Sequence, residues 1–289
     1  MEMVKLQVSQ LKRLQHYRLI KYYEMISIII STYKPLLFQQ VSKSIEKTIG
    51  VEYEIIAIEN HAKYSICEAY NIGVSKSKYP YLCFVHEDVL FKTNDWGKRL
   101  ISTMKSDYSI GLIGVVGTKF KSSYPSALGQ SPLLWKEFMR GHIYHWDKNY
   151  FDYDNTLEHK DIEDVVCVDG VFLFTQKLIF QQCRFDEKLL THFHGYDIDF
   201  SLQVLFQSYR VVVDRCMVVD HHSDGNYSVQ NSIANRKVAK KWFWKLPVVS
   251  KDLKMTWLKR HQIDAINWYY FLVTALNRKL NRPYKDKYN

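Results

Sequence analysis

Short apolar segments, separated by longer polar and amphipathic stretches, constrain the fold of this chain more than any other feature of its sequence. Four of them follow one another from Met25 onward: MISIIIST, YEIIAIEN, YPYLCFVHEDV and IGLIGVVGT. They are apolar on almost every residue rather than on every second one, which is typical of strands buried on both faces of a parallel sheet. The sequence therefore predicts an α/β domain with a mostly parallel central sheet and helices on both faces.

Composition and cysteine usage narrow the class of protein. The 289 residues are 47% hydrophobic, so the chain can bury a large core. No stretch reaches the roughly 18 consecutive apolar residues of a membrane-spanning helix, and residues 1–24 lack the apolar region of a signal peptide. We therefore expect a cytoplasmic protein. Its cysteines are odd in number and set in apolar runs, typical of reduced core residues: Cys67, Cys83, Cys167, Cys183 and Cys216.

The net charge of +10 is concentrated at one end of the chain. Residues 231–289 hold fourteen Lys or Arg against three Asp, a net charge of +11, whereas residues 1–230 have a net charge of −1. This division argues against a nucleic-acid partner and favours contact of the tail with an anionic surface, such as a membrane at the inner face. A basic helix face in water explains the charge equally well.

Polar residues close three of the apolar segments, at the sheet edge where ligands bind in parallel α/β folds. They are Ser31, Thr32 and Tyr33, then Glu59 and Asn60, and then His86, Glu87 and Asp88. Three adjacent ionisable groups repel or desolvate one another unless something such as a metal ion is shared among them. A strand cap without a ligand role accounts for any single one of these ends equally well.

From residue 118 onward, the apolar segments are less regularly spaced and less uniform in composition. Residues 118–164 are irregular and rich in Tyr, Trp and His, so we expect loops that cover the site. The segment DVVCVDGVFLFTQKLIF predicts two strands joined by a turn at Asp169 and Gly170, followed by the start of a helix. We expect a helix over DIDFSLQVLFQ, and a strand pair or one bent strand over YRVVVDRCMVVDHH.

The order of these motifs resembles that of the family 2 type glycosyltransferases of the nucleotide-sugar (GT-A) fold, in a branch with HxD where most members have DxD. The elements are SIIISTYKP, EIIAIEN, AYNIGVSKSKYPYLCFVHEDVLF, IGLIGVVG, VDGVFLFTQ, FHGYDIDFSLQ and VVDHHS. The resemblance covers a catalytic domain at 25–245, with a nucleotide-binding half at 25–117, an insert or lid at 118–164 and an acceptor half at 165–245. Outside it, a stripe of apolar residues predicts an amphipathic helix at 1–24, and the last part of the basic tail, at 246–289, is expected to be helical.

The resemblance implies a divalent metal at His86 and Asp88, because a cation stabilises the charge that builds up on a departing diphosphate. Asp88 aligns with the last Asp of DxD, and His86 replaces the first. An imidazole ligand suits Mn²⁺ better than Mg²⁺. Either His221 or His222 would complete the coordination, since strand alternation directs only one of them to the metal. A pair of histidines without a ligand role is the alternative.

The resemblance also assigns the donor, a nucleoside diphosphate sugar with UDP favoured. Ser31, Thr32 and Tyr33 would hold the base and ribose, and Glu59 would accept the hydrogen bond from the uracil N3–H. Asn71 matches the NxG segment of the family, although Tyr70 stands where a basic residue often precedes it. The other implied contacts are Asp169 and Gly170 near the donor sugar, and Glu87 as a neighbour oriented by the metal site.

The catalytic base that the resemblance implies is Asp197, with Asp199 in reserve. Direct displacement needs a carboxylate to take the proton of the acceptor hydroxyl. The family commonly has Glu-Asp here, and Tyr196 replaces the Glu. Helix capping and a first-turn acid explain Asp197 and Asp199 equally well from local physics.

Together these features predict an inverting, metal-dependent glycosyltransferase acting on a glycan or lipid-linked acceptor, as in bacterial surface polysaccharide synthesis. A non-catalytic nucleotide-sugar or glycan binding protein is the main alternative. Nucleotidyl transfer is disfavoured because STYKP offers only Lys34 to a phosphate, and a zinc hydrolase using His192 and His194 lacks a supporting motif. Four tryptophans of the tail either pack on the body or contact a membrane: Trp242, Trp244, Trp257 and Trp268.

Overall fold

The structure, a computed structural model, describes residues 24–128, 135–145, 149–152, 160–222 and 229–279. The helix expected at 1–24 therefore lies outside the described residues, apart from Glu24.

The main sheet has seven strands, and five of them run in the same direction. In this sheet β1 pairs in parallel with β2 and β3, and β13 pairs in parallel with β5, whereas β12 and β10 run against their neighbours. The mostly parallel sheet predicted from the sequence is confirmed. Its spatial order is β10 (Ile162–Val165), β13 (Arg210–Asp214), β5 (Ile110–Gly114), β12 (Phe172–Gln176), β3 (Tyr81–Val85), β1 (Ile26–Thr32) and β2 (Tyr53–Glu59).

A second sheet lies beside the first and contributes the other half of the site. Its strands in order are β11 (Cys167–Val168), β6 (Val116–Thr118), β8 (Met139–His145), β14 (Val219–His221) and β4 (Val89–Phe91), with β9 (Asn149–Asp152) paired to β8. The segment YRVVVDRCMVVDHH thus divides into two strands that belong to different sheets. A third pair joins β7 (Phe120–Lys121) to β15 (Val248–Val249).

The region 118–164 is more regular than the sequence indicates. Strand β8 within it pairs with β6 on one side and with β14 on the other, so it forms the middle of the second sheet. The expectation of covering loops is therefore wrong for residues 139–145. Residues 129–134, 146–148 and 153–159 lie outside the described parts of the chain.

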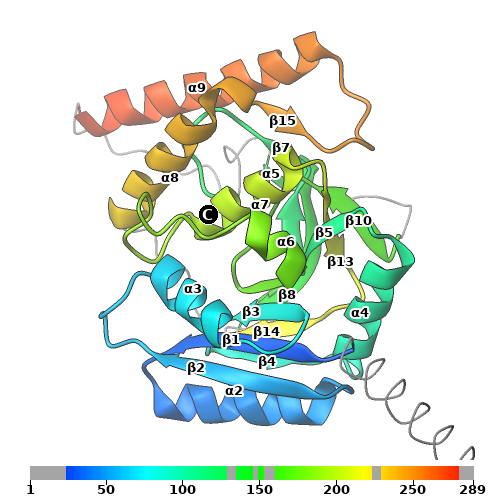
Figure 1. Cartoon of the computed structure of the whole chain (residues 1–289). Coiled ribbons are helices and arrows are strands. Elements are labelled where there is room, and N and C mark those ends of the chain that lie inside the picture. Colours follow the sequence, from blue (N-terminus) through cyan, green and yellow to red (C-terminus); the bar gives the residue numbers. More distant parts are fainter. Residues whose placement is uncertain (1–23, 129–134, 146–148, 153–159, 223–228, 280–289) are drawn as a thin grey trace, which may run out of the picture.

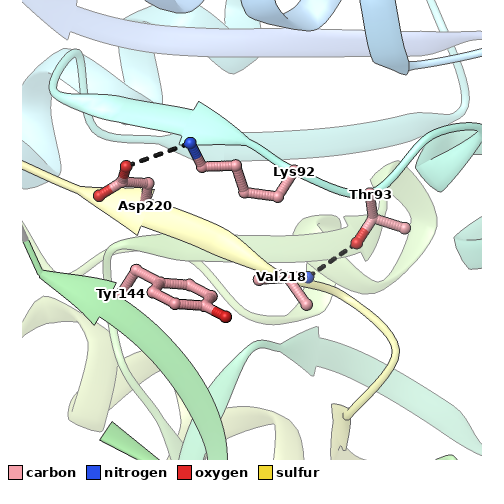
Figure 2. Close-up of a pocket in the computed structure, with 5 residues that line it drawn as sticks. All are labelled: Lys92, Thr93, Tyr144, Val218 and Asp220. Carbon is pink, nitrogen blue, oxygen red and sulfur yellow. Dashed lines mark hydrogen bonds and ion pairs between the residues drawn. The ribbon is translucent and has the colours of Figure 1, made fainter. Parts of the chain in front are cut away.

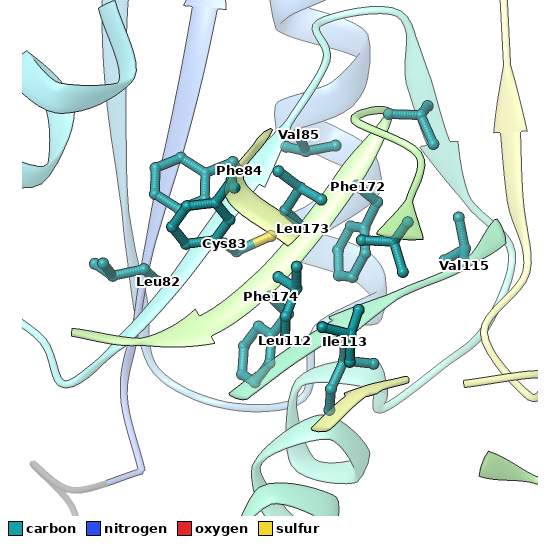
Figure 3. Close-up of a cluster of buried hydrophobic side chains, with 14 of the residues drawn as sticks. Leu82, Cys83, Phe84, Val85, Leu112, Ile113, Val115, Phe172, Leu173 and Phe174 are labelled. Carbon is teal, nitrogen blue, oxygen red and sulfur yellow. The ribbon is translucent and has the colours of Figure 1, made fainter. Parts of the chain in front are cut away.

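Helices cover both faces of the main sheet, as predicted (Figure 1). On one face Phe84 of β3 packs against aromatic rings of α3 and α6, and on the other Phe172 of β12 packs against Trp96 of α4. The central side chains of β3, β5 and β12 form one continuous apolar core (Figure 3). The helices are α2 (Pro35–Thr48), α3 (Ile66–Lys76), α4 (Trp96–Ser106), α5 (Trp135–Phe138), α6 (Lys177–Gln182), α7 (Tyr196–Phe206), α8 (Val229–Trp242) and α9 (Trp257–Lys279), with a 3-10 turn at Phe243–Lys245.

The C-terminal helix α9 is fastened to the segment after β7, at the end of the molecule opposite α2 (Figure 1). Asp264 of α9 accepts hydrogen bonds from both hydroxyls of Ser122 and Ser123 and from the Ser123 backbone N–H, which lies 2.8 Å away. The indole N–H of Trp268 donates to the Ser123 hydroxyl at 2.9 Å. The inner face of α9 is thus held by specific polar contacts as well as by packing.

Candidate active site

Three potential metal ligands meet where the two sheets adjoin. His86 follows the last residue of β3, Asp88 precedes the first residue of β4, and His221 ends β14. One donor atom from each of the three lies within 4.8 Å of the other two. Backbone hydrogen bonds fix the strand ends, because His86 N–H donates to the Val171 carbonyl at 3.2 Å and His222 N–H donates to the Asp88 carbonyl at 2.9 Å.

Strand alternation decides between the two adjacent histidines. Nε2 of His221 lies 3.4 Å from Oδ1 of Asp88, inside the cluster. The His222 ring lies on the other side of the strand, with its Nε2 3.5 Å from Oδ2 of Asp220. His222 is therefore not one of the clustered ligands, a choice that the sequence left open. His192 and His194, considered for a zinc site, are not members of the cluster either.

The outer side of β14 borders a different feature, a shallow cavity of about 390 Å³. Figure 2 shows Lys92 reaching Asp220, an ion pair of 3.3 Å, with Tyr144 of β8 nearby. The Thr93 hydroxyl accepts a hydrogen bond of 2.9 Å from Val218 N–H at the same place. None of the three clustered ligands lines this cavity.

The environment keeps His86 and Asp88 in the protonation states that bind metals. Burial, with the neighbouring His221 ring, lowers the pKa of His86 to about 4, so its imidazole is neutral. Burial alone would raise the pKa of Asp88, but its contact with His221 and the charge on that ring outweigh burial, and this pKa lies below its usual value. Metal ligands must be deprotonated, and both residues meet that condition near neutral pH.

The residues fit a divalent cation on two further counts. Oδ1 of Asp88 is buried and accepts no hydrogen bond from the described part of the chain, so this anionic oxygen is available to a cation. Two imidazole nitrogens and one carboxylate oxygen form a mixed donor set, which suits Mn²⁺ and similar transition metals better than Mg²⁺.

A chain of hydrogen bonds leads from the cluster to the predicted base. The Tyr196 hydroxyl lies 2.7 Å from Nε2 of His86 and donates to the Gly170 carbonyl at 2.9 Å. Gly170 N–H in turn donates to Oδ2 of Asp197 at 3.2 Å. A Cβ at Gly170 would lie 2.2 Å from the Tyr196 hydroxyl, so only glycine allows this approach. The turn at Asp169 and Gly170 thus links the two ends of the site.

Asp197 has the electrostatics of a general base. It lies in the first turn of α7, which begins after Gly195 in the left-handed region at φ +82°. Burial, followed by the charge of Asp169, raises the pKa of Asp197 to about 7. A carboxyl group in this range takes up a proton more readily than an ordinary surface carboxylate does.

Asp199, the reserve candidate, has a different position. Its side chain is fully buried and accepts hydrogen bonds from Gln203 at 2.8 Å, from Lys241 at 2.9 Å and from the Trp242 indole at 2.7 Å. These bonds fasten α8 to α7. Both carboxylate oxygens of Asp199 therefore accept hydrogen bonds from within the fold, which argues against a role as the catalytic base.

The residues predicted to contact the nucleotide fall into a buried group, Thr32 and Glu87, and an exposed group that includes Tyr33. Oε2 of Glu87 accepts hydrogen bonds from the Thr32 hydroxyl at 2.5 Å and from the backbone N–H groups of Tyr33 and Lys34 at 3.1 Å each. Thr32 and Glu87 are both buried, so they hold the loop after β1 rather than offer free polar groups. The Tyr33 ring, by contrast, is 53% exposed.

The remaining sites flank this loop. Glu59 is exposed at the end of β2. Ser31 accepts a hydrogen bond of 3.1 Å from the side chain of Asn60. Asn71, however, is directed elsewhere, because its amide donates to the Phe185 carbonyl at 2.9 Å and to Glu187 at 2.7 Å. Asn71 therefore positions the segment before α7.

One residue at the cluster was not singled out from the sequence. Phe193 is 49% exposed, and its ring centroid lies 5.3 Å from that of His86. Its position two residues before Gly195, in THFHGYD, is the only signal that the sequence offers for it.

Comparisons with known proteins identify the family and the fold of the chain. A profile described as "Glycosyltransferase like family" matches residues 27–243. The streptomycin biosynthesis protein StrF of Streptomyces griseus is 27% identical over 168 residues, which are 56% of this chain and 54% of StrF. The structure of GalNAc-T7 with UDP, GalNAc and Mn²⁺ overlays with a TM-score of 0.52 at 12% identity, covering 76% of this chain and 49% of that one.

The alignments thus span about half the length of each of these relatives. The overlay with GalNAc-T7 shares the fold, and the profile covers most of the chain, from the first strand to the end of α8. The chain belongs to the glycosyltransferase-like family and has the GT-A fold.

Proposed function

We propose that this protein is an inverting, metal-dependent glycosyltransferase that moves a sugar from a UDP-sugar to a hydroxyl group of the acceptor. The observation that carries the proposal is the cluster of His86, Asp88 and His221 at the end of β3, connected through Gly170 to Asp197. A UDP-bound and Mn²⁺-bound protein of the same fold, GalNAc-T7, supports the choice of nucleotide and metal.

The division of labour follows from the site. A divalent cation held by the three clustered ligands would supply positive charge to the departing diphosphate. Asp197 accepts the proton of the acceptor hydroxyl, and its raised pKa suits this task near neutral pH. We assign one carboxylate as the base and none as a nucleophile. The acceptor oxygen therefore displaces the diphosphate in a single step, which inverts the anomeric centre.

The nucleotide would lie over the carboxyl ends of β1 and β2. We assign base recognition to the exposed Glu59 and stacking to the exposed Tyr33, with Ser31 beside them. Thr32 and Glu87 act indirectly by fixing the loop that carries Tyr33. Asp169 and Gly170 border the donor sugar.

Calorimetric titration of UDP, GDP and dTDP, each with and without Mn²⁺, tests the proposal on the wild type and on Asp88→Ala. We expect UDP to bind in a Mn²⁺-dependent manner and the variant to lose that dependence. Nucleotide affinity that is the same with and without Mn²⁺, and the same in the wild type and in Asp88→Ala, would contradict the metal site. Absence of binding to all three nucleotides would favour the alternative of a non-catalytic glycan binding protein.

For the acceptor we propose a glycan or lipid-linked hydroxyl, as in surface polysaccharide synthesis at the cytoplasmic face of a membrane. Among the described helices, none is both long and apolar enough to cross a bilayer. The outer face of α9 nevertheless exposes a stripe of apolar side chains, spaced three or four residues apart after the first: Leu258, Ile266, Tyr269, Leu272 and Leu276. Two of the four tail tryptophans, Trp244 and Trp257, are exposed at 93% and 65%, while Trp242 and Trp268 pack on the body.

An anionic bilayer is the partner that fits this stripe, because the tail of residues 231–289 has a net charge of +11. Sedimentation with anionic vesicles at low salt should carry down the wild type. The double variant Leu272→Glu and Leu276→Glu should remain in the supernatant, whereas Tyr108→Glu, a change at an exposed ring after α4, should sediment normally. Equal sedimentation of all three proteins would refute a role for the stripe.

A further inference from the structure

Two of the positions at which the chain departs from the common family pattern contact each other. His86 stands in place of the first Asp of DxD, and Tyr196 stands in place of the Glu before the base. Nε2 of His86 and the Tyr196 hydroxyl oxygen are only 2.7 Å apart. We propose that Tyr196 is a positioning residue that holds the proton of His86 on Nε2 and so reserves Nδ1 for the cation. This inference rests on the metal site of the proposed function.

The direction of the hydrogen bonds follows from counting protons. A phenol has one proton to donate, and the Tyr196 hydroxyl contacts both the Gly170 carbonyl, at 2.9 Å, and His86. The carbonyl can only accept, so the phenol proton is directed to Gly170. The phenol oxygen then accepts from His86, which places the imidazole proton on Nε2. A neutral imidazole has only one such proton, so its lone pair is on Nδ1.

Tyr196 is held rigidly enough for this role. The side chain is 3% exposed, and its ring packs edge-on against Tyr70 and Phe185 at centroid distances of 5.7 and 5.9 Å. The absence of a Cβ at Gly170 leaves room for the hydroxyl, as a methyl group there would lie 2.2 Å from it. Loss of this hydroxyl would leave the imidazole free to exchange its proton between the two nitrogens.

An acceptor behind a metal-binding histidine normally selects the tautomer and orients the ring, and its removal weakens metal binding by about 10- to 100-fold. A carboxylate or a backbone carbonyl is the usual acceptor. Here a phenol that is itself anchored to a carbonyl would serve. The replacement of Asp by His and of Glu by Tyr would then be one coupled change that preserves a metal site.

The tautomer can be read directly in the metal-free protein. Long-range ¹H–¹⁵N correlation spectra of protein labelled at histidine show which ring nitrogen carries the proton, and the His86→Asn variant identifies the His86 signals among the eleven histidines. We expect the proton on Nε2 in the wild type and a mixture of tautomers in Tyr196→Phe. A wild-type proton on Nδ1 would overturn the proposal, whatever the activity of the protein.

Mn²⁺ titration followed by the EPR signal of the free ion provides the second readout. Tyr196→Phe should raise the Kd for Mn²⁺ about tenfold. The control is Tyr108→Phe, which removes the hydroxyl of an exposed ring after α4. We expect wild-type affinity from this control. If Tyr196→Phe also binds like the wild type, Tyr196 has no positioning role although the metal site stands; if the wild type itself fails to bind Mn²⁺, the proposed function fails, and the spectra still decide the tautomer.

Discussion

At the scale of single residues, two aspartates in one helical turn have different surroundings. Asp197 is bonded to a backbone N–H of the turn at Gly170 and has a raised pKa, whereas Asp199 is saturated by donors from α7 and α8. The sequence indicates both as acids of a first helical turn and cannot separate them. The separation depends on Gly170, 27 positions from Asp197, and on Lys241 and Trp242, 42 and 43 positions from Asp199, which local patterns do not encode.

The paired variants Asp197→Asn and Asp199→Asn test this division. Asp197→Asn should lose turnover by at least about 100-fold, because it removes the base, while keeping its melting temperature and its nucleotide binding. Asp199→Asn should lower the free energy of unfolding by about 1–3 kcal/mol, since the amide NH2 replaces an oxygen that accepts hydrogen bonds in this buried network. Turnover and thermal unfolding, measured on both variants, check the pair. A stable, inactive Asp199→Asn beside an active Asp197→Asn would reverse our assignment.

The raised pKa of Asp197 predicts an unusual pH dependence. The carboxylate acts as a base only when deprotonated, so kcat/KM should fall as the pH drops through about 7. An ordinary carboxyl would sustain activity down to about pH 4. His86 does not cause this fall, because its pKa is lowered to about 4. A profile of kcat/KM at saturating Mn²⁺, flat from pH 8 to pH 5, would exclude Asp197 as the titrating base.

At the scale of elements, the strands that build the site were largely predictable, and their side-chain partners were not. The continuous apolar runs correctly predicted β1, β3 and β5, because burial on both faces leaves a clear pattern, and they also predicted the half-buried edge strand β2. Strand β8 escaped notice since Arg140, His142 and His145 interrupt MRGHIYH, which therefore lacks a continuous apolar run, although the strand pairs on both sides. The choice of His221 over His222 required the register of β14 against β4, which only the fold provides.

Glu87, between β3 and β4, holds the end of β1 and the loop that follows it. Glu87→Gln should lower the free energy of unfolding by about 1–3 kcal/mol, because one charged oxygen of the wild-type side chain accepts three hydrogen bonds from the end of β1 and the loop after it. Chemical denaturation measures the change. Glu59→Gln is the matched control at the exposed end of β2: its stability should stay within about 0.5 kcal/mol of the wild type, while its affinity for UDP falls. Equal stability of the two variants would mean that the Glu87 network contributes little.

At the scale of the whole molecule, the described chain is a body of two large sheets and one two-stranded sheet, with α9 fastened across one end. The bonds of Asp264 and Trp268 to Ser122 and Ser123 bring residues more than 140 positions apart into contact. The inner face of α9 therefore belongs to the packed body, and its outer face is the surface that we assign to the bilayer.

Removal of the Asp264 carboxylate should loosen this helix. Asp264→Ala leaves two serine hydroxyls and one backbone N–H without their acceptor, so we expect a loss of about 2–3 kcal/mol and faster proteolytic cleavage within α9. Gln262→Ala, on the exposed side of the same helix, serves as control and should behave like the wild type. Limited proteolysis of both variants is the measurement; cleavage at the same rate would show that packing alone holds α9.

The short strand β14 limits which insertions and deletions the family can tolerate next to the site. Its alternation points His221 to the cluster with His86 and Asp88, and Asp220 and His222 away from it. Gain or loss of a single residue in the turn between β13 and β14 would, if the strand slipped by one position, put a carboxylate or the second histidine in the place of His221. Insertions and deletions in this turn should therefore be counter-selected unless they leave the register intact, whereas point substitutions at its exposed positions should accumulate freely.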